Sequence, residues 1–171
     1  MSADGHLPGH YSPTTDHSAT RIALVTATWH AQVVDDLYRT AAAELERLGI
    51  APDRQERLSV PGTFEIPLAA RWATGRVDAV LCFGCVIQGE TRHNEYINQS
   101  VFTALQSLML GSSKPVLNGV LTTDTLEQAL ARVHGPKGYK GIECAQAALQ
   151  LIDLQRAQAA KGRQPMGLRL D

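Results

Sequence analysis

Residues 78–96 read DAVLCFGCVIQGETRHNEY, an apolar run followed by a polar stretch that holds glycine, threonine and histidine. The apolar part, residues 78–84, has the length and the continuous hydrophobicity of a strand that is buried on both faces. The polar stretch leads into residues 94–110, which are predicted to form a helix that ends at Gly111. A strand, a polar turn and a helix in this order are the repeating unit of an α/β fold.

The same alternation continues on both sides of this stretch. Further strands are predicted at residues 21–27, 55–60 and 114–121, and further helices at residues 31–48, 66–74, 125–133 and from about Gly141 onward. Gly49 is placed to end the first helix, and Asp124 with Glu127 resembles a capping box at the start of the helix of residues 125–133. Four strands that alternate with helices predict a parallel sheet with helices on both faces.

The chain of 171 residues is predicted to form one domain over residues 21–160. Residues 1–20 are rich in Gly, Pro, Ser, Thr and His and are predicted to be a flexible tail, or an arm that orders only against a neighbour. Residues 161–171 resemble a second tail.

Composition and charge exclude several classes of function. The formal net charge of -1 leaves no basic excess for a nucleic-acid partner. No apolar run approaches the roughly 20 residues that span a bilayer, so no membrane partner is expected. Because the first 20 residues also lack the basic start and apolar core of a secretory signal, a cytoplasmic location is expected.

Cys82 and Cys85 form a CFGC pair, which raises the possibility of a redox pair or half of a zinc site. Such pairs normally lie in a turn or at the start of a helix, whereas Cys82 lies inside a predicted strand. Residues three apart on a strand point to opposite faces. The pattern therefore favours structural filling, and no metal site is predicted.

Polar and aromatic residues follow each predicted strand. In parallel α/β sheets, ligands bind beyond the carboxyl ends of the strands. The stretches at these ends are residues 28–30, 61–65, 85–93 and 122–123. They hold a tryptophan, an acid, a Gly-Thr loop and a histidine, which are the residue types that a polar, phosphorylated, aromatic ligand requires.

The candidates in these stretches, and Arg132 beyond them, each also have a structural interpretation. Thr91 belongs either to an anion site at the start of a helix or to an ordinary cap. His93 is a proton-transfer group, since histidine titrates near neutral pH, or a structural residue. Trp29 stacks on a flat heterocycle or is partly buried. Arg132 binds a phosphate or lies in a solvated turn.

Three segments together resemble the lumazine synthase family over roughly residues 21–155. They are VPGTFEIP (60–67), CFGCVIQGETRHNEYI (82–97), and GVLTTDTLEQALAR (119–132) with KG at 140–141. The resemblance implies a flavodoxin-like three-layer α/β/α sandwich with a four-stranded parallel sheet. It also implies homo-oligomers built from pentamers, with active sites between subunits.

The implied activity is that of a transferase in riboflavin biosynthesis. It condenses 5-amino-6-(D-ribitylamino)uracil with 3,4-dihydroxy-2-butanone 4-phosphate to give 6,7-dimethyl-8-ribityllumazine and phosphate, without a metal or redox cofactor. The alternative is a non-catalytic riboflavin- or lumazine-binding paralogue on the same scaffold. An electron carrier that uses flavin mononucleotide lacks support, because TATWHA rather than a Ser/Thr-rich loop follows the first strand.

The resemblance also implies the roles of individual residues. His93 matches the proton-transfer residue. The pyrimidine and the ribityl chain are expected at Trp29, Thr63, Phe64, Glu65, Cys85, Val86, Ile87 and Asn118. The phosphate is expected at Glu90, Thr91, Arg132 and Lys140, with Arg132 contributed by a neighbouring subunit.

The chain departs from the common family pattern at several of these positions. Many members have phenylalanine where Asn118 stands, and this loss weakens stacking on one side of the ligand. Many have a basic residue at Gln88 and an aromatic residue at Asn94. Trp29 replaces the commoner phenylalanine and enlarges the stacking surface.

Overall fold

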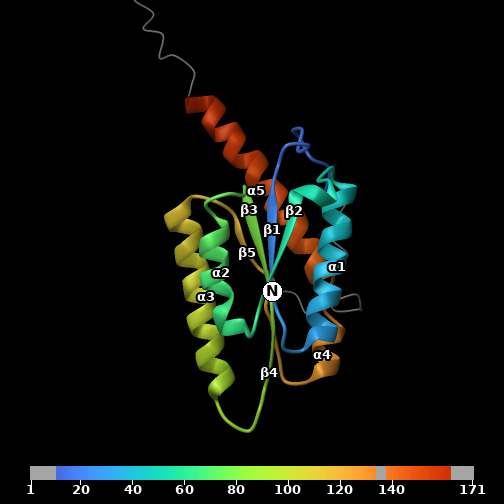
Figure 1. Ribbon diagram of the computed structural model, residues 1–171, viewed down its shortest axis with the longest axis vertical. Helices are drawn as coiled ribbons and strands as arrows, with labels where there is room; N and C mark the ends of the chain where they lie inside the picture. Colours follow the sequence, from blue (N-terminus) through green and yellow to red (C-terminus); the bar gives the residue numbers. More distant parts are fainter. Residues whose placement is uncertain (1–10, 134–137, 163–171) are drawn as a thin grey trace, which may run out of the picture.

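The computed structural model describes residues 11–133 and 138–162 of the chain. Its main sheet is parallel, with the strand order β2-β1-β3-β5. These strands are β1 (Ile22–Ala27), β2 (Gln55–Val60), β3 (Ala79–Phe83) and β5 (Val116–Asn118). Helices α1 (Ala31–Arg47) and α5 (Lys140–Gly162) cover one face, and α2 (Ile66–Ala73) and α3 (His93–Ser112) cover the other (Figure 1). The predicted three-layer α/β/α sandwich with a four-stranded parallel sheet is confirmed.

The central strands are buried on both faces, which explains their unbroken hydrophobicity. Ile22 and Leu24 of β1 pack among the side chains of α1 and α5, whereas Ala23 and Val25 pack among those of α2 and α3. Successive side chains of a strand point to opposite faces, so each face needs its own apolar set. Within the described residues strand β2 pairs with β1 alone, and it alternates mainly between partly buried and exposed residues, as expected at an edge.

The strand predicted over residues 114–121 is divided into two. Its first half is β5, and its end becomes β6 (Leu121–Thr123), which pairs with β4 (Cys85–Ile87) in a separate parallel pair. The division falls at Gly119, where an added Cβ would lie 2.5 Å from the Phe83 ring. The backbone therefore approaches the ring closely and leaves the main sheet there.

Two helix boundaries also differ from the prediction. Helix α3 continues through Gly111 to Ser112 and ends before Ser113, which adopts a left-handed conformation with φ of 52°. Helix α4 (Leu126–Leu130) is shorter than predicted, and its N-cap is Thr125 and not Asp124, because the Thr125 hydroxyl accepts a hydrogen bond from the Gln128 N–H. The short 3-10 helices η1 (Pro52–Arg54) and η2 (Thr63–Glu65) precede β2 and α2.

Residues 11–20 lie along α5 of the same chain and are anchored at Asp153. The side chains of Tyr11 and Thr15 donate to the Asp153 carboxylate, and the buried His17 ring lies 3.0 Å from it. For these residues the structure differs from the predicted flexible tail, because the acceptor that orders them lies more than a hundred residues away in sequence. Residues 1–10 and 163–171 lie outside the described residues.

None of the helices in the described part of the chain is both long and apolar enough to cross a membrane.

Candidate active site

A cavity of about 400 Å³ lies beyond the carboxyl ends of the strands. The main-sheet strands end toward the lower side of the molecule in Figure 1. We call the cavity the strand-end pocket. It brings together most of the residues that the sequence predicted for the site: Trp29, Thr63, Phe64, Glu65, Cys85, Val86, Ile87, Thr91 and His93. Three separate segments of the chain contribute these residues, as the strand-end rule requires.

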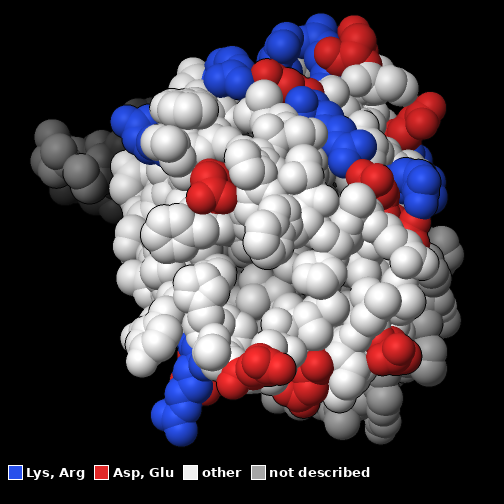
Figure 2. Space-filling view, turned by 60° about the horizontal axis from the view of Figure 1, so that its bottom comes forward, with Lys and Arg blue, Asp and Glu red and all other residues white. Residues whose placement is uncertain are grey.

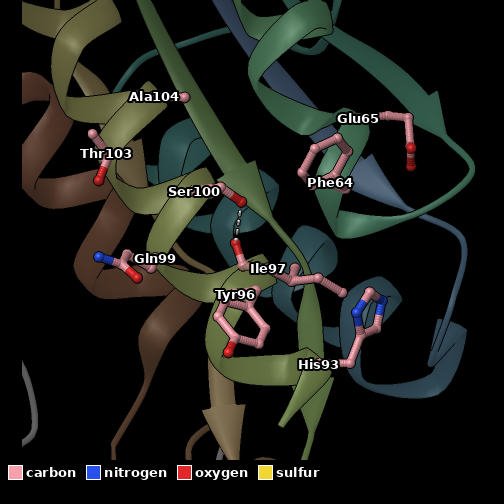
Figure 3. Close-up of a pocket in the computed structure, with 9 residues that line it drawn as sticks. All are labelled: Phe64, Glu65, His93, Tyr96, Ile97, Gln99, Ser100, Thr103 and Ala104. Carbon is pink, nitrogen blue, oxygen red and sulfur yellow. Dashed lines mark hydrogen bonds between the residues drawn. The ribbon is translucent and has the colours of Figure 1, made fainter.

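A second hollow of about 870 Å³ opens outward between η2 and α3. We call it the outer groove. It shares Phe64, Glu65, His93 and Ile97 with the strand-end pocket, so these four side chains separate the two spaces. Figure 3 shows Phe64 and Glu65 on one side of the groove, and His93 and Tyr96 on α3 at the other. The pocket and the outer groove are therefore neighbouring spaces with a shared wall.

Trp29 stands at the mouth of the pocket, where β1 passes into α1. The following residue, His30, has a left-handed backbone with φ of 55°, and its carbonyl accepts hydrogen bonds from Val33 and Val34 in the first turn of α1. This turn ends the strand abruptly and begins the helix at once. The Trp29 side chain is 72% exposed while it also lines the pocket. A flat ring in this position is open for stacking.

Glu65 and Thr63 are positioned by close contacts of η2. The Glu65 carboxylate accepts a hydrogen bond of 2.9 Å from the N–H of Gly62. Thr63 is only 7% exposed and packs against Gly84, where an added Cβ would lie 2.7 Å from the threonine hydroxyl. Gly84 thus lets η2 approach the strand, which brings Phe64 and Glu65 to the pocket.

One edge of β4 offers backbone groups to the pocket. The Leu121 N–H donates to the Gly84 carbonyl, and the Gln88 N–H donates to the Thr123 carbonyl, so residues 84 and 88 face β6. Because backbone groups alternate along a parallel strand, those of Cys85 and Ile87 face the opposite edge. Among the described residues no strand pairs with that edge. A ligand with donors and acceptors on its rim can bind there.

Cys85 contributes to this wall as a neutral thiol. Its side chain is buried, and burial raises the pKa of the Cys85 thiol to about 11. Burial likewise raises the pKa of Cys82, and that of Cys144 to about 12. All three are free, so at neutral pH none is a reactive thiolate. This supports structural filling for the CFGC pair.

The polar loop of residues 88–92 connects β4 to α3. Gly89 and Thr91 line the pocket, and His93 is the first residue of the helix. The N-cap residue, Arg92, makes no side-chain capping bond within the described structure, although its carbonyl accepts a hydrogen bond from the Glu95 N–H. Exposed N–H groups at a helix start favour an anion.

The other predicted site residues lie away from the strand-end pocket. Arg132 borders a separate hollow beside α4 and donates a hydrogen bond of 2.7 Å to the Gln128 carbonyl. Lys140 lies 3.5 Å from Glu143 at the start of α5. Asn118 accepts a hydrogen bond from the Val120 N–H, and Glu90 is an exposed loop residue that does not line the pocket.

The pocket lining described by the structure therefore holds no lysine or arginine. Figure 2, which brings this end of the molecule forward, shows a broad uncharged surface with charged side chains mainly around its rim. Nor does any cluster of three or more His, Cys, Asp or Glu side chains suited to a metal ion occur in residues 11–133 and 138–162.

Several lining residues were not among the predicted site residues: His30, Gly62, Gly89, Asn94 and Ile97. Four of them directly adjoin predicted residues: His30, Gly62 and Gly89 lie within the strand-end stretches named from the sequence, and Asn94 follows His93. Ile97 follows His93 by one helical turn and therefore lies on the same face of α3. The outer groove residues further along α3, such as Ser100 and Ala104, continue that spacing.

Comparison with known proteins gives a consistent result. The family model described as 6,7-dimethyl-8-ribityllumazine synthase matches residues 19–156. A protein of that name from Cytophaga hutchinsonii is 41% identical over 153 residues, which cover 88% of this chain and 96% of the relative. The one from Xanthomonas euvesicatoria is 40% identical (87% and 96% covered), and the one from Halorhodospira halophila is 42% identical (80% and 88% covered).

Proposed function

Because the chain belongs to the 6,7-dimethyl-8-ribityllumazine synthase family, we propose that the strand-end pocket is the active site of a transferase in riboflavin biosynthesis. The enzyme condenses 5-amino-6-(D-ribitylamino)uracil with 3,4-dihydroxy-2-butanone 4-phosphate and releases 6,7-dimethyl-8-ribityllumazine and phosphate. The observation that carries the assignment of the site is the convergence of the predicted residues on one cavity. The comparisons lend no support to a non-catalytic binding paralogue.

The pyrimidine is proposed to lie between Trp29 and the free edge of β4. The exposed indole stacks on the flat ring, while backbone groups of Cys85 and Ile87 pair with the donors and acceptors on its rim. Val86 adds an apolar contact from the same strand. The geometry supports this placement, because the ring and the strand edge line the same cavity.

The ribityl chain is proposed to extend past η2. Its hydroxyl groups reach the Glu65 carboxylate, of which one oxygen already accepts from Gly62 and the other is available. Phe64 lines both the pocket and the outer groove beside Glu65, so the polyol chain is proposed to pass along it. Thr63 supports this wall from a buried position.

His93 is proposed to transfer protons during the reaction. The pyrimidine amine attacks the ketone, water leaves to give an imine, phosphate is eliminated, and the ring then closes. Ring closure releases a second water, so the two substrates give the lumazine, phosphate and two waters. Each of these steps moves a proton, and His93 lines both the pocket and the outer groove. Most of the remaining acceleration comes from holding the two substrates together.

The phosphate is proposed to bind at the loop of residues 88–92, with its cations supplied by another subunit. Thr91 and the start of α3 provide hydroxyl and N–H donors, with Glu90 in the same loop. A doubly charged phosphate also requires cations, which the described pocket lining lacks. Arg132 and Lys140 lie elsewhere on the chain, so they serve the site of a neighbouring copy.

This division of the site leads to an assembly of pentamers with active sites between subunits. Large apolar side chains are exposed on α2 and α3, among them Leu68, Trp72, Tyr96 and Leu110. Such surfaces mark protein contacts. Asn118 is proposed to form part of the wall that one subunit presents to the next. A cytoplasmic location belongs to the same proposal.

The decisive experiment is an assay of the purified chain with both substrates, without any added cofactor. Lumazine fluorescence reports the product, and the spontaneous condensation without protein is the control. The expected result is a rate clearly above that background which falls when His93 or Arg132 is replaced. A rate equal to the background, together with tight riboflavin binding in the same sample, would instead establish a binding protein.

A further inference from the structure

The side chains of Gln88 and Asn94 are hydrogen-bonded to one another across the loop of residues 89–92, which joins β4 to α3. Asn94 Nδ2 donates to Gln88 Oε1 at 2.5 Å. Gln88 stands just before the loop of residues 89–92, and Asn94 lies in the first turn of α3 behind it. These are two positions at which the sequence departs from the common family pattern, and the structure shows that they contact each other.

Gln88 also binds the loop itself. Its Nε2 donates to the Gly89 carbonyl at 2.8 Å and, at the longer distance of 3.5 Å, to the Thr91 carbonyl. Its own backbone N–H donates to Thr123 on β6 at 2.9 Å. One residue, whose backbone is bonded to β6, therefore binds two carbonyls of the loop and the first turn of α3.

The hydrogen bond to Gln88 fixes the side-chain amide of Asn94. Its Oδ1 is buried and has no hydrogen-bond partner among the described residues, so Nδ2 alone is bonded. Asn94 directly follows His93 in the first helical turn, where the N-cap residue Arg92 makes no side-chain capping bond within the described residues. The bond to Gln88 thus fixes the start of α3 in a place where the usual cap is missing.

We propose that Gln88 and Asn94 are positioning residues that together hold the loop of residues 89–92 and the first turn of α3 in the conformation that binds the phosphorylated substrate. They act through Thr91 and His93 and do not themselves transfer protons. With the carbonyls of Gly89 and Thr91 bonded to Gln88, the loop presents N–H and hydroxyl donors to an anion, not carbonyl oxygens. This inference rests on the proposed function of the pocket.

The test uses full-length Gln88→Ala, Asn94→Ala, the double variant, and the exchanged pair Q88N/N94Q. Each single change is expected to raise the KM for 3,4-dihydroxy-2-butanone 4-phosphate about tenfold, the size of effect that one or two net hydrogen bonds allow. The KM for the pyrimidine should stay nearly constant. The KM of the double variant should be no higher than that of the single variants, because each single change already breaks the Gln88–Asn94 contact. The exchanged pair should recover to within about threefold of the unmodified KM.

Gln155→Ala is the matched control. Gln155 is an exposed glutamine that also donates to a backbone carbonyl, that of Ser113, but it lies far from the pocket on α5. It should leave both KM values unchanged. Additive losses in the double variant, or equal losses for both substrates, would overturn the proposal.

Hydrogen exchange of the unliganded proteins separates this inference from the function on which it rests. Absence of synthase activity in the unmodified chain would refute the proposed function alone. Faster exchange of the amides of residues 89–95 in Gln88→Ala and Asn94→Ala, but not in Gln155→Ala, would still show that Gln88 and Asn94 hold the loop in place. Unchanged exchange in both variants would overturn this inference, whatever the activity.

Discussion

At the scale of single residues, the proposed chemistry depends on side chains that contribute little to the fold. Trp29 and His93 are both exposed, and neither belongs to the two buried clusters that pack against the sheet. Their positions are instead set by the backbone, through the left-handed turn at His30 and the start of α3. They can therefore be replaced without loss of the core, and their variants report on binding and turnover.

Trp29→Ala is expected to weaken pyrimidine and riboflavin binding together by roughly 5- to 100-fold, the usual range for one lost stacking contact. The thermal midpoint should not change, since the indole is 72% exposed. Titration calorimetry or fluorescence quenching measures the affinities, and Trp29→Phe, which keeps a flat ring, should retain most of them. Equal affinity in the alanine variant would refute the stacking role.

His93→Ala is expected to lower kcat by about 100-fold or less, because proximity of the substrates supplies much of the catalysis. Single-turnover measurements with both substrates at saturation give this number. His30→Asn is a suitable control, since it removes the other imidazole of the pocket and asparagine tolerates the left-handed conformation. Unchanged turnover in His93→Ala would exclude this residue from the mechanism.

At the scale of elements, the predictions are accurate where one strong local pattern determines the structure. The strand β2 matches its predicted residues, and α1 ends beside Gly49, whose φ is 95°. Errors occur where two signals compete, as at α4, where Asp124 and Thr125 are adjacent cap candidates and the threonine forms the bond. Gly111 is a similar case, because a glycine can lie within a helix when packing favours continuation.

The contact between residues 11–20 and α5 predicts a pH dependence of stability. Burial of the Asp153 carboxyl opposes its ionisation, but hydrogen bonds from Thr15, Tyr11 and Thr14 outweigh this and hold the pKa of Asp153 well below its usual range. A depressed pKa in the folded state stabilises the fold above the unfolded-state value of about 3.9, and this stabilisation is lost as the pH falls below it.

Asp153→Asn is therefore expected to lower the free energy of unfolding by about 2–4 kcal/mol at pH 7, since it weakens several bonds to a buried charge. The difference from the unmodified protein should shrink when the pH is lowered below about 4. Denaturation at a series of pH values measures this. A difference that is the same at every pH would show that the carboxylate charge has no role.

At the scale of the whole molecule, the predicted site residues lie in separate places on the chain. The strand-end pocket holds the proposed stacking and proton-transfer residues, while Arg132 lies beside α4, at a separate hollow. From the sequence, the convergence of strand ends could be predicted, because the topology of a parallel sheet brings them to one edge. The sequence could not predict which of these residues fall outside the pocket, because that depends on the path of the chain after β6.

A mixing experiment tests the proposed sharing of sites. Assemblies of His93→Ala subunits and assemblies of Arg132→Ala subunits should each be weakly active. After unfolding and joint refolding, about a quarter of the sites under random mixing would combine an intact His93 with an intact Arg132 from the neighbour. Activity should then rise well above that of either parent. No recovery in verified mixed assemblies would place both residues in one subunit's site.

The sequence by itself determined the order of the main strands and helices, the burial of the central strands and three of the four stretches expected at the pocket, since residues 122–123 do not line it. These features follow from periodicity and turn residues within a few positions of each other, so local interactions suffice. Tertiary structure alone decided the division at Gly119, the pairing of β4 with β6, the attachment of residues 11–20 to Asp153, and the contact of Gln88 with Asn94 across the loop of residues 89–92. Each of these depends on where another part of the folded chain lies, such as the Phe83 ring that meets the backbone at Gly119, and no local pattern specifies that distance.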